Sequence, residues 1–372
     1  MDQHEHTDED MARPETWQGM RASLDGFPFP ELTRCREEYE RRPGLGERQW
    51  ECLTMLDLPE LGVKFNVHRK LQTSLMGCVF HGTKRLPPSQ TEPGSPAPAI
   101  GTRPIPVAIK TSSLEEARNC RDENIFREIA IMRHLYTEAG EHPGIPSVMP
   151  LMHACISELR LHVITPLCES GDLLSHVRCG FGMEEHTVRK WFRQILLALA
   201  YIHSRGICHH DLSPENIVIT GSNNVAVVMD FGMAQRLRTG PEGDFVPVQD
   251  ERVCGKFRYM APEIFRNQAY DGRQADIWSV AVILVLCFTG RYAWGAPTAS
   301  IHHGDTRSDM FNYMHFRRYG PMWILESLRG GRRLSQEAEN LICMMLIIDR
   351  RRRPCSAEAL ARHVFFLTQR GW

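Results

Sequence analysis

Apolar and polar residues follow two different periods along this chain. Val63-Lys64-Phe65-Asn66-Val67 alternates, as the residues of a half-buried strand do. Val107-Ala108-Ile109-Lys110 is a short apolar run that ends in a cation, and it predicts a buried strand. Later positions recur at helical spacing and predict one long amphipathic helix: Val188, Phe192, Ile195, Leu199 and Ile202. The pattern predicts an α+β chain whose second part is mainly helical.

Other segments add to this outline. Helical spacing also recurs at Ile125, Ile129, Met132 and Leu135, and a very apolar helix is expected from Asp276 to Cys287. Gly206 suits a left-handed cap at the end of the long helix. Residues 81–106 are rich in proline and predict an extended surface insertion. Before the first strand, a set of apolar positions predicts a short helix that docks on the folded body: Trp50, Leu53, Met55, Leu56 and Leu58.

Composition narrows the class of protein. With 372 residues, 42% of them apolar, the chain can bury a large core. A net charge of −1, from 44 basic and 45 acidic residues, provides no strong field toward nucleic acid or a membrane surface. The twelve cysteines form no Cys-x-x-Cys pair, which favours a reducing compartment over a zinc site or disulfide framework. The first twenty residues are acidic and lack an apolar core, so we expect no signal peptide there. The longest apolar run, Val280 to Phe288, is too short to span a bilayer. We therefore expect an intracellular protein with no nucleic-acid partner and no membrane insertion; the cytoplasm is the favoured compartment and the nucleus is the alternative.

Candidate chemistry lies on two neighbouring loops. His209 to Asn216 places the Asp211 carboxylate, which can accept a proton, near the Asn216 carbonyl, which can bind a hard cation. Asp230 follows the apolar run Val225 to Met229 and adds a second carboxylate at a strand end. Together these groups are typical of phosphoryl transfer with a divalent cation.

Lys110 adds a cation at the end of an apolar strand. A lysine there needs a partner, because an unpaired buried charge is costly. Glu128 is the favoured partner, on the helix that contains Ile125 and Ile129, and Glu123 is the competing candidate.

Five motifs occur in one order: Val107 to Lys110, Glu128, His209 to Asn216, Asp230-Phe231-Gly232 and Ala261-Pro262-Glu263. From about Gly62 to about Leu367 the chain resembles the eukaryotic-type protein kinase family in its serine/threonine form. The resemblance implies a two-lobed α+β fold with ATP between the lobes. The small lobe would span residues 62–165 and contain an antiparallel sheet with one key helix. The hinge would be 166–169 and the mainly helical lobe 170–367, with an N-terminal extension at 1–61 and a tail at 368–372.

The resemblance also implies roles for individual residues. Lys110, held by Glu128, would bind the α and β phosphates of ATP, Asp230 and Asn216 would hold Mg²⁺, and Asp211 would orient the substrate hydroxyl. Gln72 to Val79 stands where the family has a glycine-rich hairpin, and only Gly77 remains, with Gln72 and Ser74 in place of the other glycines. The adenine site would comprise Val79, Ala108 and Val218, the gatekeeper Thr165, and the hinge residues Pro166 and Cys168.

Two departures from the family pattern lie in the loop around Asp211. His210 replaces the arginine that binds a phosphate on the activation segment, and Thr239 and Tyr259 are the hydroxyl side chains between Asp230 and Glu263. We therefore predict that phosphorylation of the activation segment does not switch this chain on, as it does in many members of the family. Ser213 replaces a lysine that neutralises the transferring phosphate, a loss that should lower the rate but leave the fold intact.

The favoured function is Mg²⁺- and ATP-dependent phosphorylation of serine or threonine in protein substrates. A pseudokinase, which uses the fold as an ATP-binding or nucleotide-free scaffold, is the main alternative, and tyrosine or small-molecule kinases are weaker ones. In the same reading, Asp276 would cap the backbone of the catalytic loop. The basic run Arg350 to Arg353 could be a binding patch, but we favour a structural interpretation in which Arg353 pairs with Glu263 and the other arginines face solvent.

Overall fold

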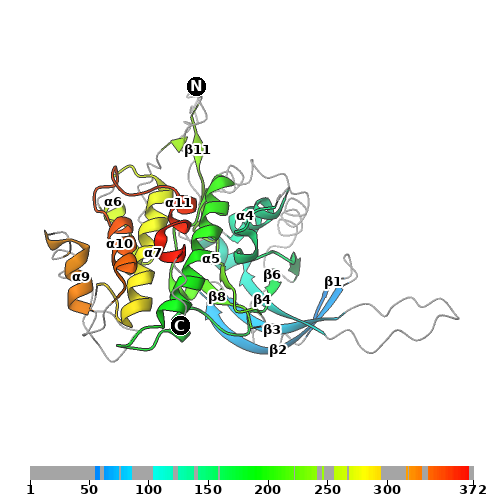
Figure 1. The fold of residues 1–372 in the computed structure, drawn as a ribbon. Coiled ribbons are helices and arrows are strands. Elements are labelled where there is room, and N and C mark those ends of the chain that lie inside the picture. Colours follow the sequence, from blue (N-terminus) through cyan, green and yellow to red (C-terminus); the bar gives the residue numbers. More distant parts are fainter. Residues whose placement is uncertain are drawn as a thin grey trace, which may run out of the picture. The chain divides into compact units, whose positions relative to one another are not determined.

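The computed structural model describes residues 55–58, 63–74, 77–85, 104–119, 125–137, 141–157, 160–221, 223–240, 245–246, 255–265, 268–294, 316, 318–328 and 334–367 (Figure 1). They form two compact units. The first unit comprises Met1–Tyr136 and Met149–Cys168, and the second comprises Thr137–Val148 and Glu169–Trp372. The fold is that of a protein kinase, with a sheet-rich small lobe and a mainly helical large lobe.

The first unit contains a six-stranded sheet in the order β1-β2-β3-β4-β6-β5. All neighbouring strands are antiparallel. The strands are β1 (Met55–Leu58), β2 (Val63–Ser74), β3 (Gly77–Arg85), β4 (Ile105–Ser113), β5 (His153–Ser157) and β6 (Arg160–Pro166). Two helices, α3 (Leu114–Asn119) and α4 (Ile125–Tyr136), follow β4. α4 has a wholly buried row that includes the four predicted positions Ile125, Ile129, Met132 and Leu135.

Alternation along β4 separates a core face from an open face. Val107 and Ile109 are fully buried and belong to one apolar cluster with Phe65, Phe80 and Ile164. Ala108 and Lys110 lie between them in sequence and are half-buried, because successive side chains of a strand point to opposite faces. The open face is therefore the one that can receive a ligand.

Two predictions about the first unit were wrong in part. Met55–Leu58 is a strand that pairs with Val63–Asn66 of β2, where the apolar pattern predicts a short helix. An edge strand supplies the backbone hydrogen bonds that β2 would otherwise lack on that side. Trp50 and Leu53 lie outside the described residues. His81–Arg85 belongs to β3 and not to an insertion, because its backbone pairs with both β2 and β4; residues 86–103 also lie outside the described part.

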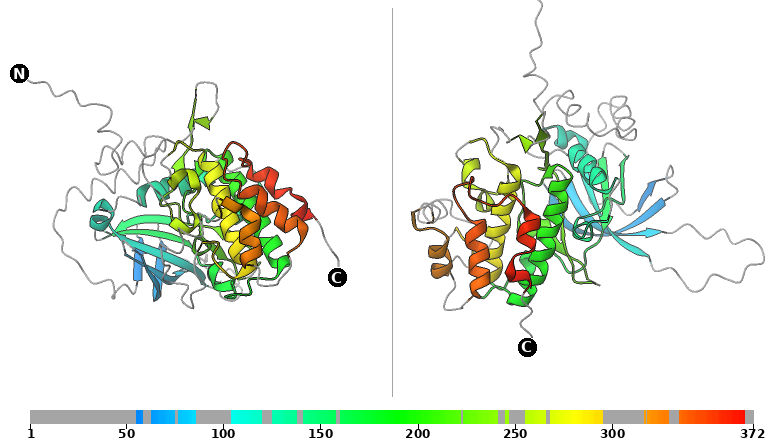
Figure 2. Two further views of the ribbon diagram at one scale, coloured as in Figure 1. Left: turned by 90° about the vertical axis from the view of Figure 1, so that its left-hand side faces the viewer. Right: turned by 45° about the horizontal axis from the view of Figure 1, so that its top comes forward.

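Helices dominate the second unit. They are α5 (Glu185–Ser204), α6 (Pro262–Phe265), α7 (Gly272–Thr289), α9 (Pro321–Leu328), α10 (Gln336–Met345), α11 (Ala357–Ala361) and α12 (Val364–Leu367). In Figures 1 and 2, α5, α7, α10 and α11 lie side by side, and α5 contacts both α7 and α11. The predicted stripe on α5 is fully buried. Gly206 has a φ of 73°, so the predicted left-handed position after α5 is confirmed.

Helix α7 is the centre of this unit. It is longer than its apolar run, and by length and composition it could cross a membrane, but 89% of its 18 residues are buried inside the structure. Asp271 caps its first turn by accepting a hydrogen bond from the Arg273 N–H at 2.9 Å, and Gly290 ends it with a φ of 65°. Burial on all sides explains why its sequence lacks an amphipathic stripe.

Short elements place the loops of the second unit. The strands are β7 (Ile207–Cys208), β8 (Ile217–Ile219), β9 (Ala226–Val228), β10 (Gln235–Arg236), β11 (Arg238–Thr239) and β12 (Phe245–Val246). The 3-10 turns are η4 (Ile145–Ser147), η5 (Leu174–His176), η6 (Pro214–Asn216) and η7 (Phe257–Tyr259). β7 pairs with β10 and β8 pairs with β9, so the segments before and after Asp211 are both fixed by hydrogen-bonded pairs.

Candidate active site

The expected ion pair between Lys110 and Glu128 is present in the first unit. Lys110 Nζ lies 2.8 Å from Glu128 Oε2, and the two side chains are 19% and 5% exposed. Glu128 belongs to the first turn of α4, where the positive end of the helix dipole favours a carboxylate. The competing residue, Glu123, lies outside the described residues. The pair holds the lysine head at a defined place on the open face of the sheet.

Strand register brings several predicted nucleotide-binding residues to that same face. Residues directly opposite each other in antiparallel strands share a face, and Val79 pairs with Lys110 while Thr165 pairs with Ala108. Pro166 pairs with Val107 and so belongs to the alternate set. The four residues Val79, Ala108, Lys110 and Thr165 thus form a half-apolar surface with one cation, as binding of a purine and phosphates requires.

The remaining predicted nucleotide contacts lie at the edges of this surface or outside the unit. Cys168 ends the first unit, and burial raises the pKa of its thiol to about 11, so the thiol stays protonated at neutral pH. Val218 belongs to β8 of the second unit, where it pairs with Val227.

The hairpin between β2 and β3 stands in place of a glycine-rich loop. Gln72 is exposed and pairs with Val79, and Ser74 pairs with Gly77 at the end of the ladder. The pairing shifts register between Lys70 and Gln72, which indicates an irregularity beside the predicted phosphate site. Ser74 Oγ is buried without a hydrogen-bond partner among the described residues.

Asp276 of α7 anchors the catalytic loop in the second unit. Its carboxylate accepts hydrogen bonds from the His209 and His210 N–H groups, both at 2.9 Å, and lies 2.9 Å from His203 Nε2. Burial acts to raise the pKa of Asp276, but the His203 hydrogen bond and the nearby histidines outweigh it and lower the pKa. The predicted cap is confirmed. His210 has a φ of 63°, so this carboxylate also secures a backbone conformation that non-glycine residues rarely adopt.

Asp211 and Asn216 are held together on this loop. Asn216 Nδ2 donates to the Asp211 carbonyl at 2.7 Å and to the Asp211 carboxylate at 2.9 Å. The same carboxylate accepts a bond of 3.1 Å from the Lys256 N–H. Burial raises the pKa of Asp211, and the negative charge of Asp230 adds to this, while Lys256 and His209 act in the opposite direction. Because both Asn216 bonds use the amide nitrogen, its carbonyl oxygen is directed away from Asp211.

Asp230 follows β9 and has a φ of 65°. Met229, the residue before it, donates its N–H to the Asn216 carbonyl at 2.9 Å, and the Met229 carbonyl lies 3.0 Å from His209 Nε2. These bonds tie the Asp230 segment to the loop that contains Asp211. The carboxylate of Asp230 and the side-chain carbonyl of Asn216 are hard oxygen donors, so this part of the site fits Mg²⁺.

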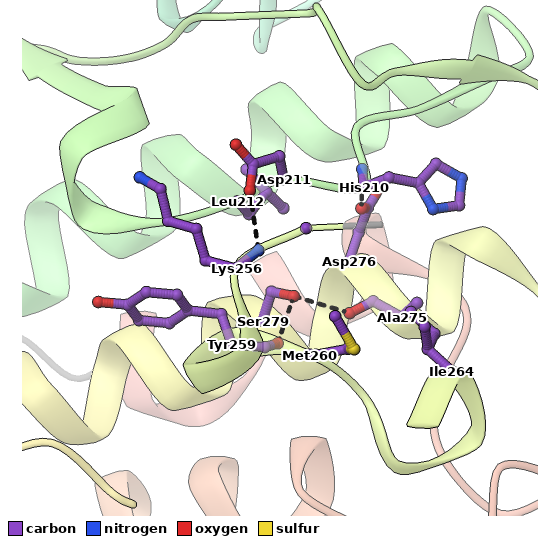
Figure 3. Close-up of a pocket in the computed structure, with 11 residues that line it drawn as sticks. His210, Asp211, Leu212, Lys256, Tyr259, Met260, Ile264, Ala275, Asp276 and Ser279 are labelled. Atoms are coloured by element: carbon purple, nitrogen blue, oxygen red, sulfur yellow. Dashed lines mark hydrogen bonds between the residues drawn. The ribbon is translucent and has the colours of Figure 1, made fainter. Parts of the chain in front are cut away.

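Lys256 is a member of this site that the sequence analysis did not single out. Its Nζ donates to Ser213 Oγ at 2.8 Å and lies 3.3 Å from Glu215 Oε2. Figure 3 shows its backbone nitrogen bonded to Asp211 and its side chain pointing away from His210. The sequence feature that could have indicated a role for Lys256 is Ser213, because the loss of a lysine at that position suggests that another residue supplies the positive charge.

A small pocket shows how closely the loop is braced. Eleven residues line it, including Asp211, Lys256, Tyr259 and Ser279 (Figure 3), and its volume is about 10 Å³. That is about the space of one water molecule, so the pocket marks packing between the loop, the segment 255–264 and α7.

The expected pair of Arg353 and Glu263 is also present. The guanidinium bonds both carboxylate oxygens, at 2.5 and 3.0 Å, and the two side chains are 0% and 3% exposed. It attaches the segment Ala261-Pro262-Glu263 to the turn before α11.

Comparison with known proteins agrees with this geometry. Residues 102–366 match the family described as protein kinase domain. The chain is 30% identical over 236 residues to CBL-interacting serine/threonine-protein kinase 16 of Arabidopsis thaliana, covering 61% of this chain and 44% of that protein. It is 26% identical over 221 residues to sperm motility kinase 3A of Mus musculus, covering 59% and 38%. The match thus spans less than half the length of these relatives. This chain belongs to the eukaryotic-type protein kinase family.

Proposed function

We propose that this chain transfers the γ-phosphate of ATP to serine or threonine hydroxyls of proteins in a reaction that requires Mg²⁺. The observation that carries the proposal is the double hydrogen bond from the Asn216 amide to Asp211. It fixes a proton acceptor and a cation ligand on one loop. The Arabidopsis relative is a serine/threonine-protein kinase by name, which supports this choice of hydroxyl over tyrosine.

The residues have separate tasks in the proposed reaction. The substrate oxygen bonds to the γ-phosphorus, the bond from that phosphorus to ADP breaks, and the hydroxyl proton passes to the Asp211 carboxylate. Lys110, fixed by Glu128, binds the α and β phosphates. Asn216 and Asp230 are the residues that would hold Mg²⁺, which when bound neutralises charge on the phosphate oxygens.

A transfer assay with labelled ATP and Mg²⁺ tests the proposal, with a generic basic protein and the chain itself as acceptors. Asp211→Asn should lower transfer by ~10²- to 10⁴-fold, because the proton acceptor is lost. Glu116→Gln, the same chemical change at an exposed position of α3, serves as the matched control and should retain the wild-type rate. Equal rates in the Asp211→Asn variant and the wild type would contradict the proposed role.

The scaffold alternative predicts a different result. No transfer by the wild type, together with a rise in melting temperature on adding Mg-ATP, would identify an ATP-binding pseudokinase. No transfer and no thermal shift would identify a nucleotide-free scaffold.

Localisation in the cytoplasm is part of the same proposal, and the scattered cysteines support it. Imaging of a fluorescent fusion tests it, and a signal confined to the secretory pathway would overturn it.

A further inference from the structure

We propose that Lys256 supplies, from the segment ahead of Ala261-Pro262-Glu263, the positive charge that the catalytic loop lacks at Ser213. The inference rests on the proposed phosphoryl transfer and identifies a further catalytic residue for it. Its basis is the position of one ammonium group beside the very residue at which the sequence departs from its family.

Lys256 contacts the catalytic loop at two points. Its N–H donates to Asp211 Oδ1 at 3.1 Å, and its Nζ donates to Ser213 Oγ at 2.8 Å. Ser213 is fully buried, so its hydroxyl is a fixed acceptor and the ammonium has a defined place. The ammonium group of Lys256 therefore lies beside Ser213, two residues along the loop from the proton acceptor Asp211. Position 213 is where the family's catalytic-loop lysine would begin.

Gly255 makes this approach possible. Its φ is 90°, and a Cβ built on it would lie 2.5 Å from the His210 carbonyl oxygen, closer than any side chain tolerates. The backbone at 255 can therefore press against the loop only as glycine. This contact brings the next residue, Lys256, within reach of both Asp211 and Ser213.

The Lys256 ammonium is able to interact with a phosphate, because its ion pair with Glu215 is weak. Its other partner, Glu215, is 3.3 Å away, and the two side chains are 43% and 38% exposed. Solvent screens an ion pair with that exposure, so it holds the lysine only weakly. Phosphoryl transfer spreads negative charge over the equatorial oxygens of the phosphate, which attract such a cation more strongly. In the proposed step Lys256 keeps its proton throughout, and the substrate proton goes to Asp211.

The first test is Lys256→Met, which removes the charge but keeps the backbone N–H and most of the side-chain length. Loss of one stabilising group at a developing charge should lower kcat by ~10²-fold. Because the interaction strengthens in the transition state, KM for ATP should change much less than kcat. Lys190→Met, at an exposed position of α5, is the matched control and should retain the wild-type kcat.

The second test moves the lysine back to the loop. Ser213→Lys in the wild-type background places two ammonium groups together at a buried position and should lower both kcat and the melting temperature. Ser213→Lys combined with Lys256→Thr vacates the space and restores a single cation, so kcat should recover to within ~10-fold of the wild type. A purely structural lysine would show no such recovery.

The outcomes distinguish failure of this inference from failure of the proposed phosphoryl transfer. Transfer by the wild type with an equal kcat in Lys256→Met overturns the inference and leaves the proposed function in place. The inference is also overturned if Lys256→Met is slow and the variant that combines Ser213→Lys with Lys256→Thr is equally slow while it keeps the wild-type melting temperature. Absence of transfer in the wild type overturns the proposed function, and the inference falls with it.

Discussion

The buried pair of Arg353 and Glu263 allows a quantitative prediction. Arg353 donates to both oxygens of Glu263, to the Ile347 carbonyl at 2.9 Å and to the Gln274 carbonyl at 3.2 Å. Its guanidinium carbon also lies 4.8 Å from the centre of a Trp278 ring. Glu263→Gln keeps the volume but leaves the guanidinium charge uncompensated inside the protein.

Breaking a buried pair at one partner costs about 3–5 kcal/mol. Glu263→Gln should fall at the lower end, about 3 kcal/mol, because Arg353 keeps its two backbone acceptors and the Trp278 ring. Arg353→Met should cost more, since the Glu263 carboxylate and both carbonyls lose their donor. The double variant should be destabilised by about 2 kcal/mol less than the sum of the single ones, because the two side chains contact each other directly.

Urea unfolding followed by tryptophan fluorescence at neutral pH measures these differences. Glu358→Gln is the matched control: its pair with Arg362 has the same 2.5 Å separation, but the side chains are 75% and 56% exposed. An exposed pair of this kind contributes about 0–1 kcal/mol. Equal losses of unfolding free energy in Glu263→Gln and Glu358→Gln would refute the reasoning that burial sets the cost.

Other consequences follow from single groups. Lys110→Met should lower transfer by at least ~100-fold in the kinase assay, and retention of the wild-type rate would contradict its role. Asp276→Asn should lower both transfer and unfolding free energy, the latter by about 2 kcal/mol in urea, because the His203 ring and the N–H groups of His209 and His210 lose a charged partner. Burial lowers the pKa of His162 to about 4 from 6.5, so the unfolded chain binds the additional proton. Unfolding free energy should fall by about 3 kcal/mol as the pH drops from 7.5 to 4, and His162→Gln should remove that part of the loss. Phosphatase treatment should leave the rate unchanged, since His210 replaces the arginine of the common switch; a large drop in transfer would contradict this.

Much of the fold was evident in the sequence because it depends on spacing within one element. Alternation predicted β2, and the stripe from Val188 to Ile202 predicted α5. The pairing of Lys110 with Glu128 was also predictable, because a lysine in an apolar strand requires a partner and the helix predicted around Ile125 and Ile129 contains Glu128. In the same way, the order of the motifs identified the residues of the candidate site before their geometry was known.

The apolar pattern before β2 did not decide between a strand and a helix. Leu56 and its neighbours fit either period over so short a segment, and the unpaired edge of β2 selected the strand. Similarly, the sequence marked residues 81–106 by their prolines, yet His81–Arg85 continues the sheet because strands on both sides pair with it.

The sequence by itself thus determined the class of fold, the pairing of Lys110 and the identity of the loop that contains Asp211. Only the tertiary structure placed Lys256 at Ser213, a residue 43 positions earlier in the chain. That contact depends on the path of a later segment, on the close approach of Gly255 to His210 and on packing against α7. Periodicity records which face of an element is buried, whereas contacts between distant loops depend on backbone paths that the packing of the whole unit decides.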